Sequence, residues 1–232
     1  MPRHPVLWGL GAVAGGALVA GLYVGVGACA DASGSLAAPK SQLSQLDIVG
    51  ASAPSLGLYR LPFADGITVK VFDDFDSHRP RGRIDFFGVR GAEPYRVVAA
   101  AGGRIMAIQD GYNEQQSGRA AALCHNNYVW IAHPNGEWTN YSHIARGSAT
   151  GKAHLKVGDQ VKVGQYLGDE DAIGCAMLKH LHFEVARPAP SRPIDDGGFL
   201  TDNDGGKREI RPRFCRIDRG VNKDAEYLAG AC

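Results

Sequence analysis

The chain has 232 residues, enough for one well-packed domain and a small appendage. Its 25 basic and 24 acidic side chains nearly cancel, which argues against a surface that binds nucleic acid or another polyanion. Glycine is abundant, at 31 residues, and long helical patterns are scarce after residue 60. Together these features favour an all-β fold with many turns.

The first 29 residues have the layout of an export signal. Arg3 and His4 precede an apolar run, residues 5–28, that contains no Asp, Glu, Lys or Arg. The run is also long enough to span a membrane as one helix, although its glycines weaken that helix. It ends in Val-Gly-Ala-Cys, which resembles the lipobox of bacterial lipoproteins, with Cys29 as the acylated residue. A lipid anchor, an uncleaved membrane anchor and plain secretion stay open, and all three place the rest of the chain outside the cytoplasm. We expect a location in the periplasm or cell envelope.

Cysteine usage agrees with export. Apart from Cys29 the chain has four cysteines, an even number that predicts two disulfides in an exported protein. Cys215 and Cys232 lie close together in the sequence and would close a short ring of the C-terminal tail. The other predicted pair is then Cys124 with Cys175, each just before a strand that we expect to carry functional residues.

Short strands and tight turns follow one another through the middle of the chain. Residues 30–60 show no sustained period and are typical of a tether, residues 61–189 form the expected domain, and residues 190–232 form an irregular extension closed by its own disulfide. Expected strands cover residues 68–72, 83–87, 95–99, 103–108, 128–133, 137–144, 160–163, 166–168 and 179–185. This pattern predicts a compact antiparallel β-sheet domain, built as a sandwich or barrel.

The segment at residues 179–185 is the most informative of these strands. Its polar and apolar residues alternate, so His180, His182 and Glu184 share one exposed face while the residues between them point into a core. Two imidazoles on one face of a strand suit metal binding, since one can ligate an ion while its neighbour handles protons. If this motif is taken alone, the alternative to a metal site is a pair of surface histidines on an edge strand.

Three further motifs precede this strand. They are a histidine and an aspartate within residues 78–85, Asn-Tyr-Ser-His at residues 140–143, and Val-Gly-Asp-Gln-Val-Lys-Val-Gly-Gln at residues 157–165. With His-Leu-His-Phe at residues 180–183, they resemble the lysostaphin-like, LytM-type zinc metallopeptidases over residues 66–186. The resemblance implies an antiparallel β domain with a groove across its main sheet and one zinc ion on the groove floor.

The resemblance also implies a role for each residue. The zinc ligands would be His78, Asp85 and His182, which leave a fourth position of the ion open to water. Such an ion lowers the pKa of its bound water toward about 7 and polarises a scissile carbonyl. His143 and His180 would flank that water, one accepting a proton and the other stabilising negative charge.

The first of these ligands departs from the family spacing, which is His-x-x-x-Asp. The residue four before Asp85 is Arg81, which stays protonated and cannot ligate zinc. His78 stands seven before Asp85, and Pro80 and Gly82 between them allow a loop that returns His78 to the metal. A degenerate site that holds its metal poorly, or not at all, is the competing interpretation.

The expected function is that of an exported zinc endopeptidase that hydrolyses peptide cross-links of bacterial cell-wall peptidoglycan, a substrate supplied by the resemblance alone. The alternative is a catalytically weak or inactive module that binds and activates a cell-wall amidase. Because only the early histidine is in question, the motifs favour the enzyme. We expect a monomer that binds peptidoglycan peptide stems, contacts the membrane through its anchor or lipid, and binds no nucleic acid.

Overall fold

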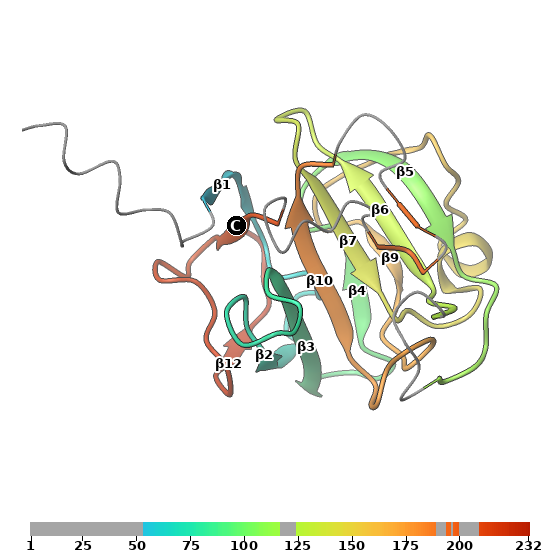
Figure 1. Cartoon of the computed structure of the whole chain (residues 1–232), viewed down its shortest axis with the longest axis horizontal. Coiled ribbons are helices and arrows are strands. Elements are labelled where there is room, and N and C mark those ends of the chain that lie inside the picture. Colours follow the sequence, from blue (N-terminus) through green and yellow to red (C-terminus); the bar gives the residue numbers. More distant parts are fainter. Residues whose placement is uncertain (1–52, 117–123, 189–193, 196, 200–208) are drawn as a thin grey trace, which may run out of the picture. The chain divides into compact units, whose positions relative to one another are not determined.

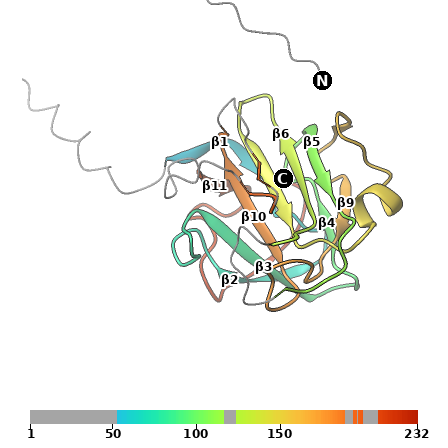
Figure 2. The ribbon, with the colours of Figure 1, turned by 45° about the vertical axis from the view of Figure 1, so that its right-hand side comes forward.

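One large antiparallel sheet organises the fold (Figures 1 and 2). The computed structural model describes residues 53–116, 124–188, 194–195, 197–199 and 209–232. The sheet has eight strands in the order β12-β2-β3-β10-β7-β6-β5-β8, and each neighbouring pair is antiparallel. The strands are β2 (Thr68–Asp73), β3 (Arg83–Arg90), β5 (Gly103–Gln109), β6 (Tyr128–Ala132), β7 (Trp138–Ser142), β8 (Gln160–Val161), β10 (Leu181–Ala186) and β12 (Glu226–Leu228). The predicted all-β fold is confirmed.

Two small sheets complete the described part of the chain. β1 (Pro54–Tyr59) pairs in parallel with β11 (Arg211–Phe214). β4 (Arg96–Val98) pairs antiparallel with β9 (Tyr166–Asp169). A single π-helical turn, η2 (Ser148–Lys152), follows β7.

Both ends of the described chain take part in the fold. β1 lies within residues 30–60, for which the sequence predicts a tether, and both β11 and β12 lie within residues 190–232, for which it predicts an irregular extension. β12 pairs with β2 at one edge of the main sheet. These three strands lie in segments that show no sustained alternation of polar and apolar residues, so only their tertiary pairing reveals them.

The hydrophobic core combines side chains of the main sheet and of the small β4–β9 sheet. Phe86, Tyr141 and Phe183 of the central strands are fully buried, at 0% exposure. Val97 and Leu167 of the small sheet belong to the same cluster. Burial of each large apolar side chain contributes roughly 1.5–3 kcal/mol. The inward face that the sequence predicts for the strand at residues 179–185 is confirmed, because Leu181, Phe183 and Val185 of β10 all belong to this core cluster.

Both predicted disulfides are present. Cys124 is bonded to Cys175, and Cys215 is bonded to Cys232. Disulfides are typical of proteins that fold in an oxidising compartment outside the cytoplasm.

The predicted export signal, including Cys29, lies outside the described residues. In the part of the chain that the structure describes, no helix is both long and apolar enough to cross a membrane.

One buried carboxylate ties β1 to the turn between β6 and β7. Glu137 is fully buried and accepts hydrogen bonds from the backbone N–H groups of Leu56 and Gly57, at 2.6 and 2.9 Å. The hydroxyl of Tyr59 donates a third hydrogen bond to it, at 2.8 Å. Burial favours the neutral acid, but these donors and Arg187 outweigh it and lower the pKa of Glu137. The first strand is thus fixed by a buried, charged carboxylate whose oxygens accept hydrogen bonds from it.

We expect Glu137→Ala to lower the free energy of unfolding by about 1–3 kcal/mol, chiefly because the buried hydroxyl of Tyr59 is left without an acceptor. Denaturant unfolding measures the loss. Glu226→Ala is the matched control, since its ion pair with Arg90 is exposed and should be worth less than about 1 kcal/mol. Equal losses in the two variants would contradict this account of β1.

Candidate metal centre

The pairing of β3 with β10 brings two of the predicted ligands together. Asp85 of β3 lies directly opposite His182 of β10, so Nδ1 of His182 is 3.2 Å from Oδ1 of Asp85. His78 comes from the loop between β2 and β3, and its Nε2 is 3.4 Å from Oδ2 of Asp85. One donor atom from each residue lies within 4.8 Å of the others, as a single metal ion requires. The structure therefore assembles the three predicted ligands.

The β2–β3 loop accounts for the unusual spacing of His78. The backbone carbonyl of Asp74 accepts the N–H of His78 at 3.0 Å, which closes a turn that directs the histidine back toward β3. Arg81, which stands at the family's usual histidine position, forms an ion pair with Asp76 instead. Arg211 binds the same Asp76 carboxylate and ties the loop to β11. The loop thus presents His78 to the site and holds Arg81 away from it.

The hydrogen bonds around the two ligand histidines fit a bound metal ion. Nδ1 of His78 lies 2.8 Å from the carbonyl oxygen of Pro80, which can only accept, so Nε2 is free to ligate. Nε2 of His182 faces Oε2 of Glu184 at 3.6 Å, which directs Nδ1 toward Asp85. That Nε2 is buried without a hydrogen-bond partner. A carbonyl or carboxylate on the far nitrogen is the usual support of a metal-bound imidazole, and two imidazoles with one carboxylate match a catalytic zinc site.

Burial and opposite charges set the protonation of these groups. Burial favours the neutral acid of Asp85, but His182 and His78 outweigh it and hold the pKa of Asp85 well below its usual range. Burial also disfavours the charged form of His182, yet Asp85 and Glu184 raise its pKa. The site is therefore built around buried carboxylates, whose negative charge a cation would balance.

His143 and His180 stand side by side next to this cluster. Their ring centroids are 4.7 Å apart, and Nε2 of His180 is 3.6 Å from Oδ1 of Asp85. Each donates its Nδ1–H to a backbone carbonyl, of Ile173 at 2.7 Å and of Leu178 at 2.9 Å. Burial, helped by the neighbouring imidazoles, lowers the pKa of His143 to about 3 and also lowers the pKa of His180. Both rings are neutral near pH 7 and keep an unprotonated Nε2 that can accept a proton.

The backbone of His143 is held in an uncommon conformation. Its φ angle is 67°, in the left-handed region that non-glycine residues rarely adopt. The carbonyl of Asn127 accepts its N–H at 2.9 Å, and the N–H of Asp171 donates to its carbonyl at 3.0 Å. Such strain is frequent at functional positions, where the surrounding structure holds it in place.

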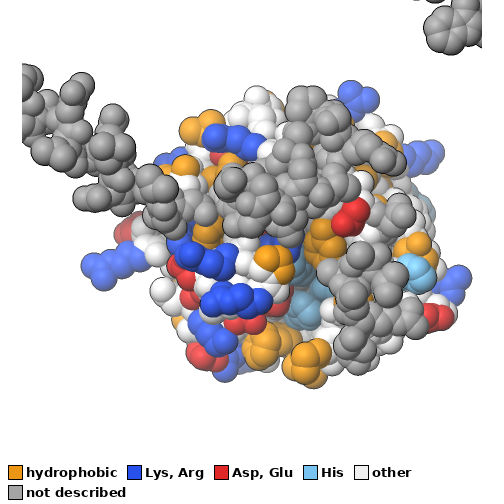
Figure 3. Space-filling view, viewed as in Figure 1, with side chains coloured by type: hydrophobic (Ala, Val, Ile, Leu, Met, Phe, Trp, Pro, Cys, Tyr) orange, Lys and Arg blue, Asp and Glu red, His pale blue; other side chains and the backbone are white. Residues whose placement is uncertain are grey.

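A groove opens over the five predicted site residues. Its cavity measures about 680 Å³, and Figure 3 shows histidine side chains at its base with apolar side chains beside them. Phe72, Met177 and Leu178 line it and are 46%, 80% and 56% exposed. On another side, the ring of Phe199 packs 5.5 Å from that of His182. The groove therefore offers apolar walls next to the candidate metal centre.

The sequence interpretation placed the polar face of β10 in solvent, and this was wrong. His182 is only 4% exposed and Glu184 is fully buried. Arg83 covers them, with its Nε donating to Glu184 at 2.9 Å, and Phe199 packs over His182. Sequence reasoning assigned no role to Arg83, Glu184 or Phe199. The one sequence signal that could have indicated a role for Glu184 is its spacing from His182, because residues two apart on a strand share a face.

Comparison with known proteins identifies a family. The sequence profile of Peptidase family M23 matches residues 80–195, a range that includes four of the five predicted site residues and begins two residues after His78. A search of curated proteins found no match.

Solved structures give distant similarities. A putative peptidase M23 from Pseudomonas aeruginosa is 24% identical, with 58% of this chain and 48% of that chain covered and a TM-score of 0.37. The catalytic domain of the M23 protein EnpA from Enterococcus faecalis is 22% identical, with 61% and 92% covered and a TM-score of 0.38. Lysostaphin from Staphylococcus simulans is 24% identical, with 53% and 44% covered and a TM-score of 0.37. The chain thus spans about half the length of the first of these relatives.

The contacts of His78 generate a prediction on metal binding. We expect His78→Ala to weaken zinc binding at least tenfold, because the site keeps only two of its three donors. Competition with a chromophoric chelator measures the zinc affinity of the folded protein. The exposed His125 offers a matched control, and His125→Ala should bind zinc as the wild type does. Unchanged affinity in His78→Ala would exclude this residue as a ligand.

The backbone of Asp171 supports the two non-ligand histidines, and a buried acid, Glu170, precedes it. The N–H of Asp171 donates to the carbonyl of His143, and the carbonyl of Asp171 accepts the N–H of His180. The preceding Glu170 is 7% exposed and accepts the N–H of Gly88 at 3.0 Å. Burial raises the pKa of Glu170 to about 7, although the N–H of Gly88 opposes the shift. The folded protein therefore binds a proton on this carboxyl more tightly than the unfolded chain does.

Stability contributed by this proton should be present below the ordinary pKa of glutamate and be lost as the pH rises through about 7. Glu170→Gln removes the titration, so the variant should gain on the order of 3 kcal/mol relative to the wild type between pH 4 and pH 8. Denaturant unfolding at several pH values measures the difference. The exposed Glu114 provides the control variant Glu114→Gln, and parallel curves for both variants would rule the assignment out.

Proposed function

Because the chain belongs to Peptidase family M23, we propose that it is an exported, zinc-dependent endopeptidase that hydrolyses peptide cross-links of bacterial cell-wall peptidoglycan. The observation that carries the proposal is the buried cluster of His78, Asp85 and His182, with two neutral histidines beside it in one groove. The choice of peptidoglycan as substrate is supported by the resemblance of the motifs to lysostaphin-like enzymes. The two disulfides support a site of action outside the cytoplasm.

The chain's own residues supply what peptide hydrolysis needs. A zinc ion held by the three ligands would polarise the scissile carbonyl and acidify water. His143 and His180 are neutral and each keeps an unprotonated Nε2, so either can take the proton of an attacking water. The imidazolium formed in this way can stabilise developing negative charge and then deliver its proton to the departing amine.

The groove walls give the substrate a surface on which to bind. Phe72, Met177 and Leu178 line the groove and are all substantially exposed. Methyl and methylene groups of a peptide stem would be buried against them, at roughly 25 cal/mol per Å² of apolar surface removed from water. Binding at this surface would hold the scissile bond beside the metal and the two histidines.

The non-ligand histidines provide the mechanistic test. His143→Ala and His180→Ala should keep near-stoichiometric zinc and lose roughly 10²–10⁴ of turnover, the usual effect of removing one acid–base or oxyanion contact. Asp85→Ala and His182→Ala should lose both zinc and turnover. Elemental analysis reports the zinc, and mass spectrometry of fragments released from purified peptidoglycan reports the turnover.

A wild-type protein that binds no zinc and releases no fragments would overturn the endopeptidase proposal. The module that activates a cell-wall amidase would then be the better account, and its signature would be faster peptidoglycan cleavage when the chain is added to such an amidase. Anchoring through Cys29 is a separate proposal, tested by labelling with a fatty-acid analogue in the wild type and in Cys29→Ser.

A further inference from the structure

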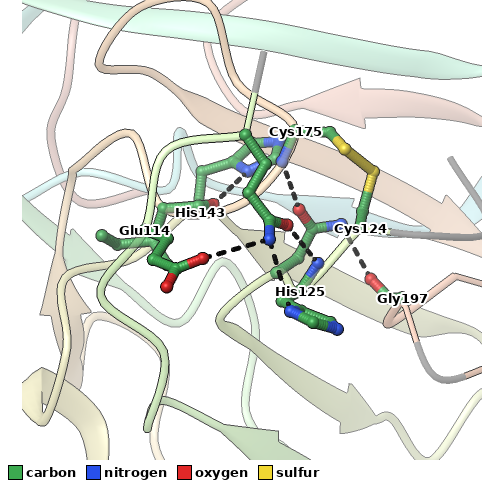
Figure 4. Close-up of a disulfide and its surroundings, with 9 residues drawn as sticks. Glu114, Cys124, His125, His143, Cys175 and Gly197 are labelled. Carbon is green, nitrogen blue, oxygen red and sulfur yellow. Dashed lines mark hydrogen bonds between the residues drawn. A yellow bond between two sulfur atoms is a disulfide. The ribbon is translucent and has the colours of Figure 1, made fainter. Parts of the chain in front are cut away.

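A loop held by a disulfide orients one of the two non-ligand histidines (Figure 4). The carbonyl of Ile173 accepts the Nδ1–H of His143 at 2.7 Å. Two residues later, Cys175 is bonded to Cys124, which lies shortly before β6. Because a carbonyl oxygen only accepts, this contact determines both the tautomer and the direction of the imidazole. The position of the loop therefore decides where the free Nε2 of His143 points.

Asn126 reinforces the same connection from inside the fold. It is fully buried, its Oδ1 accepts the N–H of Cys175 at 3.0 Å, and its Nδ2 donates to the carbonyl of Gly197 at 2.8 Å. Figure 4 shows the second of these bonds reaching the labelled Gly197. Gly174 has a φ of +92°, and a Cβ there would lie 1.9 Å from Oδ1 of Asn126. The loop thus packs on Asn126 at a distance that only glycine permits.

The chain from Cys124 to Asn127 holds His143 in two ways. The carbonyl of Asn127 accepts the backbone N–H of His143 at 2.9 Å, which fixes the main chain in its left-handed conformation. Through Asn126 and the disulfide, the same segment fixes the loop whose Ile173 carbonyl holds the ring. A single short segment that leads into β6 therefore fixes both the main chain and the side chain of His143.

We propose that Asn126 and the Cys124–Cys175 disulfide position the imidazole of His143 for proton transfer. They act on His143 through the Ile173 carbonyl, as positioning groups. Misplacement of a catalytic group by about 1 Å can cost up to 10² in rate. The consequence for activity rests on the proposed peptidase function, whereas the positioning of the ring does not.

The chain contains its own matched control, because its second disulfide, Cys215–Cys232, lies in the tail outside the groove lining. The full-length, zinc-loaded double variant Cys124→Ser/Cys175→Ser should keep stoichiometric zinc, with kcat reduced about tenfold to hundredfold and KM within about twofold. Cys215→Ser/Cys232→Ser should keep kcat within about twofold of the wild type. Unchanged kcat in the first variant, equal losses in the two, or loss of zinc together with kcat would each overturn the proposal.

A second readout is independent of catalysis. In ¹⁵N-labelled protein the Nδ1–H of His143 should give a slowly exchanging resonance, assigned by its loss in His143→Gln. The resonance should exchange faster in Asn126→Ala and in Cys124→Ser/Cys175→Ser, but not in Cys215→Ser/Cys232→Ser. Wild-type exchange in both Asn126→Ala and Cys124→Ser/Cys175→Ser would refute the positioning role. If the wild type cleaves no peptidoglycan yet the resonance behaves as expected, only the proposed function fails.

Discussion

The antiparallel pairing of β3 with β10 is the constraint on which the candidate metal centre depends. It sets Asp85 opposite His182 and Arg83 opposite Glu184, all on one face of the sheet. A slip of β10 by one residue would turn His182 and Glu184 toward the core and away from Asp85 and Arg83. Phe183 and the apolar residues on the other face prevent such a slip, because it would move them out of the core. The hydrophobic core therefore determines the geometry of the polar site.

The same pairing buries a chain of charged groups. Arg83 donates to Glu184, Glu184 faces one nitrogen of His182, and Asp85 faces the other. Burying charges costs free energy that their mutual attraction offsets only when the geometry is good. Here the chain holds an imidazole from both ends, which is how metal-binding proteins orient a ligand before the ion arrives. Functional sites commonly tolerate such a loss of folding free energy from buried charges.

His78 and His143 show how loops complete a site that strands begin. His78 reaches Asp85 from the β2–β3 loop, where three additional residues relative to the family spacing lengthen the path at little entropic cost. A strand could not absorb those residues without changing its register. His143 follows β7 directly, and its position depends on a loop contributed by a distant part of the sequence. Departures from family spacing are thus tolerated where the chain is free to loop.

Local patterns in the sequence were sufficient for several features. Alternation marked the inward face of β10, and an even cysteine count marked both disulfides. β12 escaped prediction because its segment shows no sustained alternation of polar and apolar residues, whereas the equally short β4 was predicted.

By itself the sequence determined the all-β class, the family motifs and the types of side chain available to the site. Only the tertiary structure decided that His78 meets Asp85 while Arg81 turns away, that Glu184 is buried, and that a backbone carbonyl aims His143. The physical reason is that period and spacing report on neighbours along the chain. These contacts instead join distant segments, and some run through backbone atoms that every residue shares.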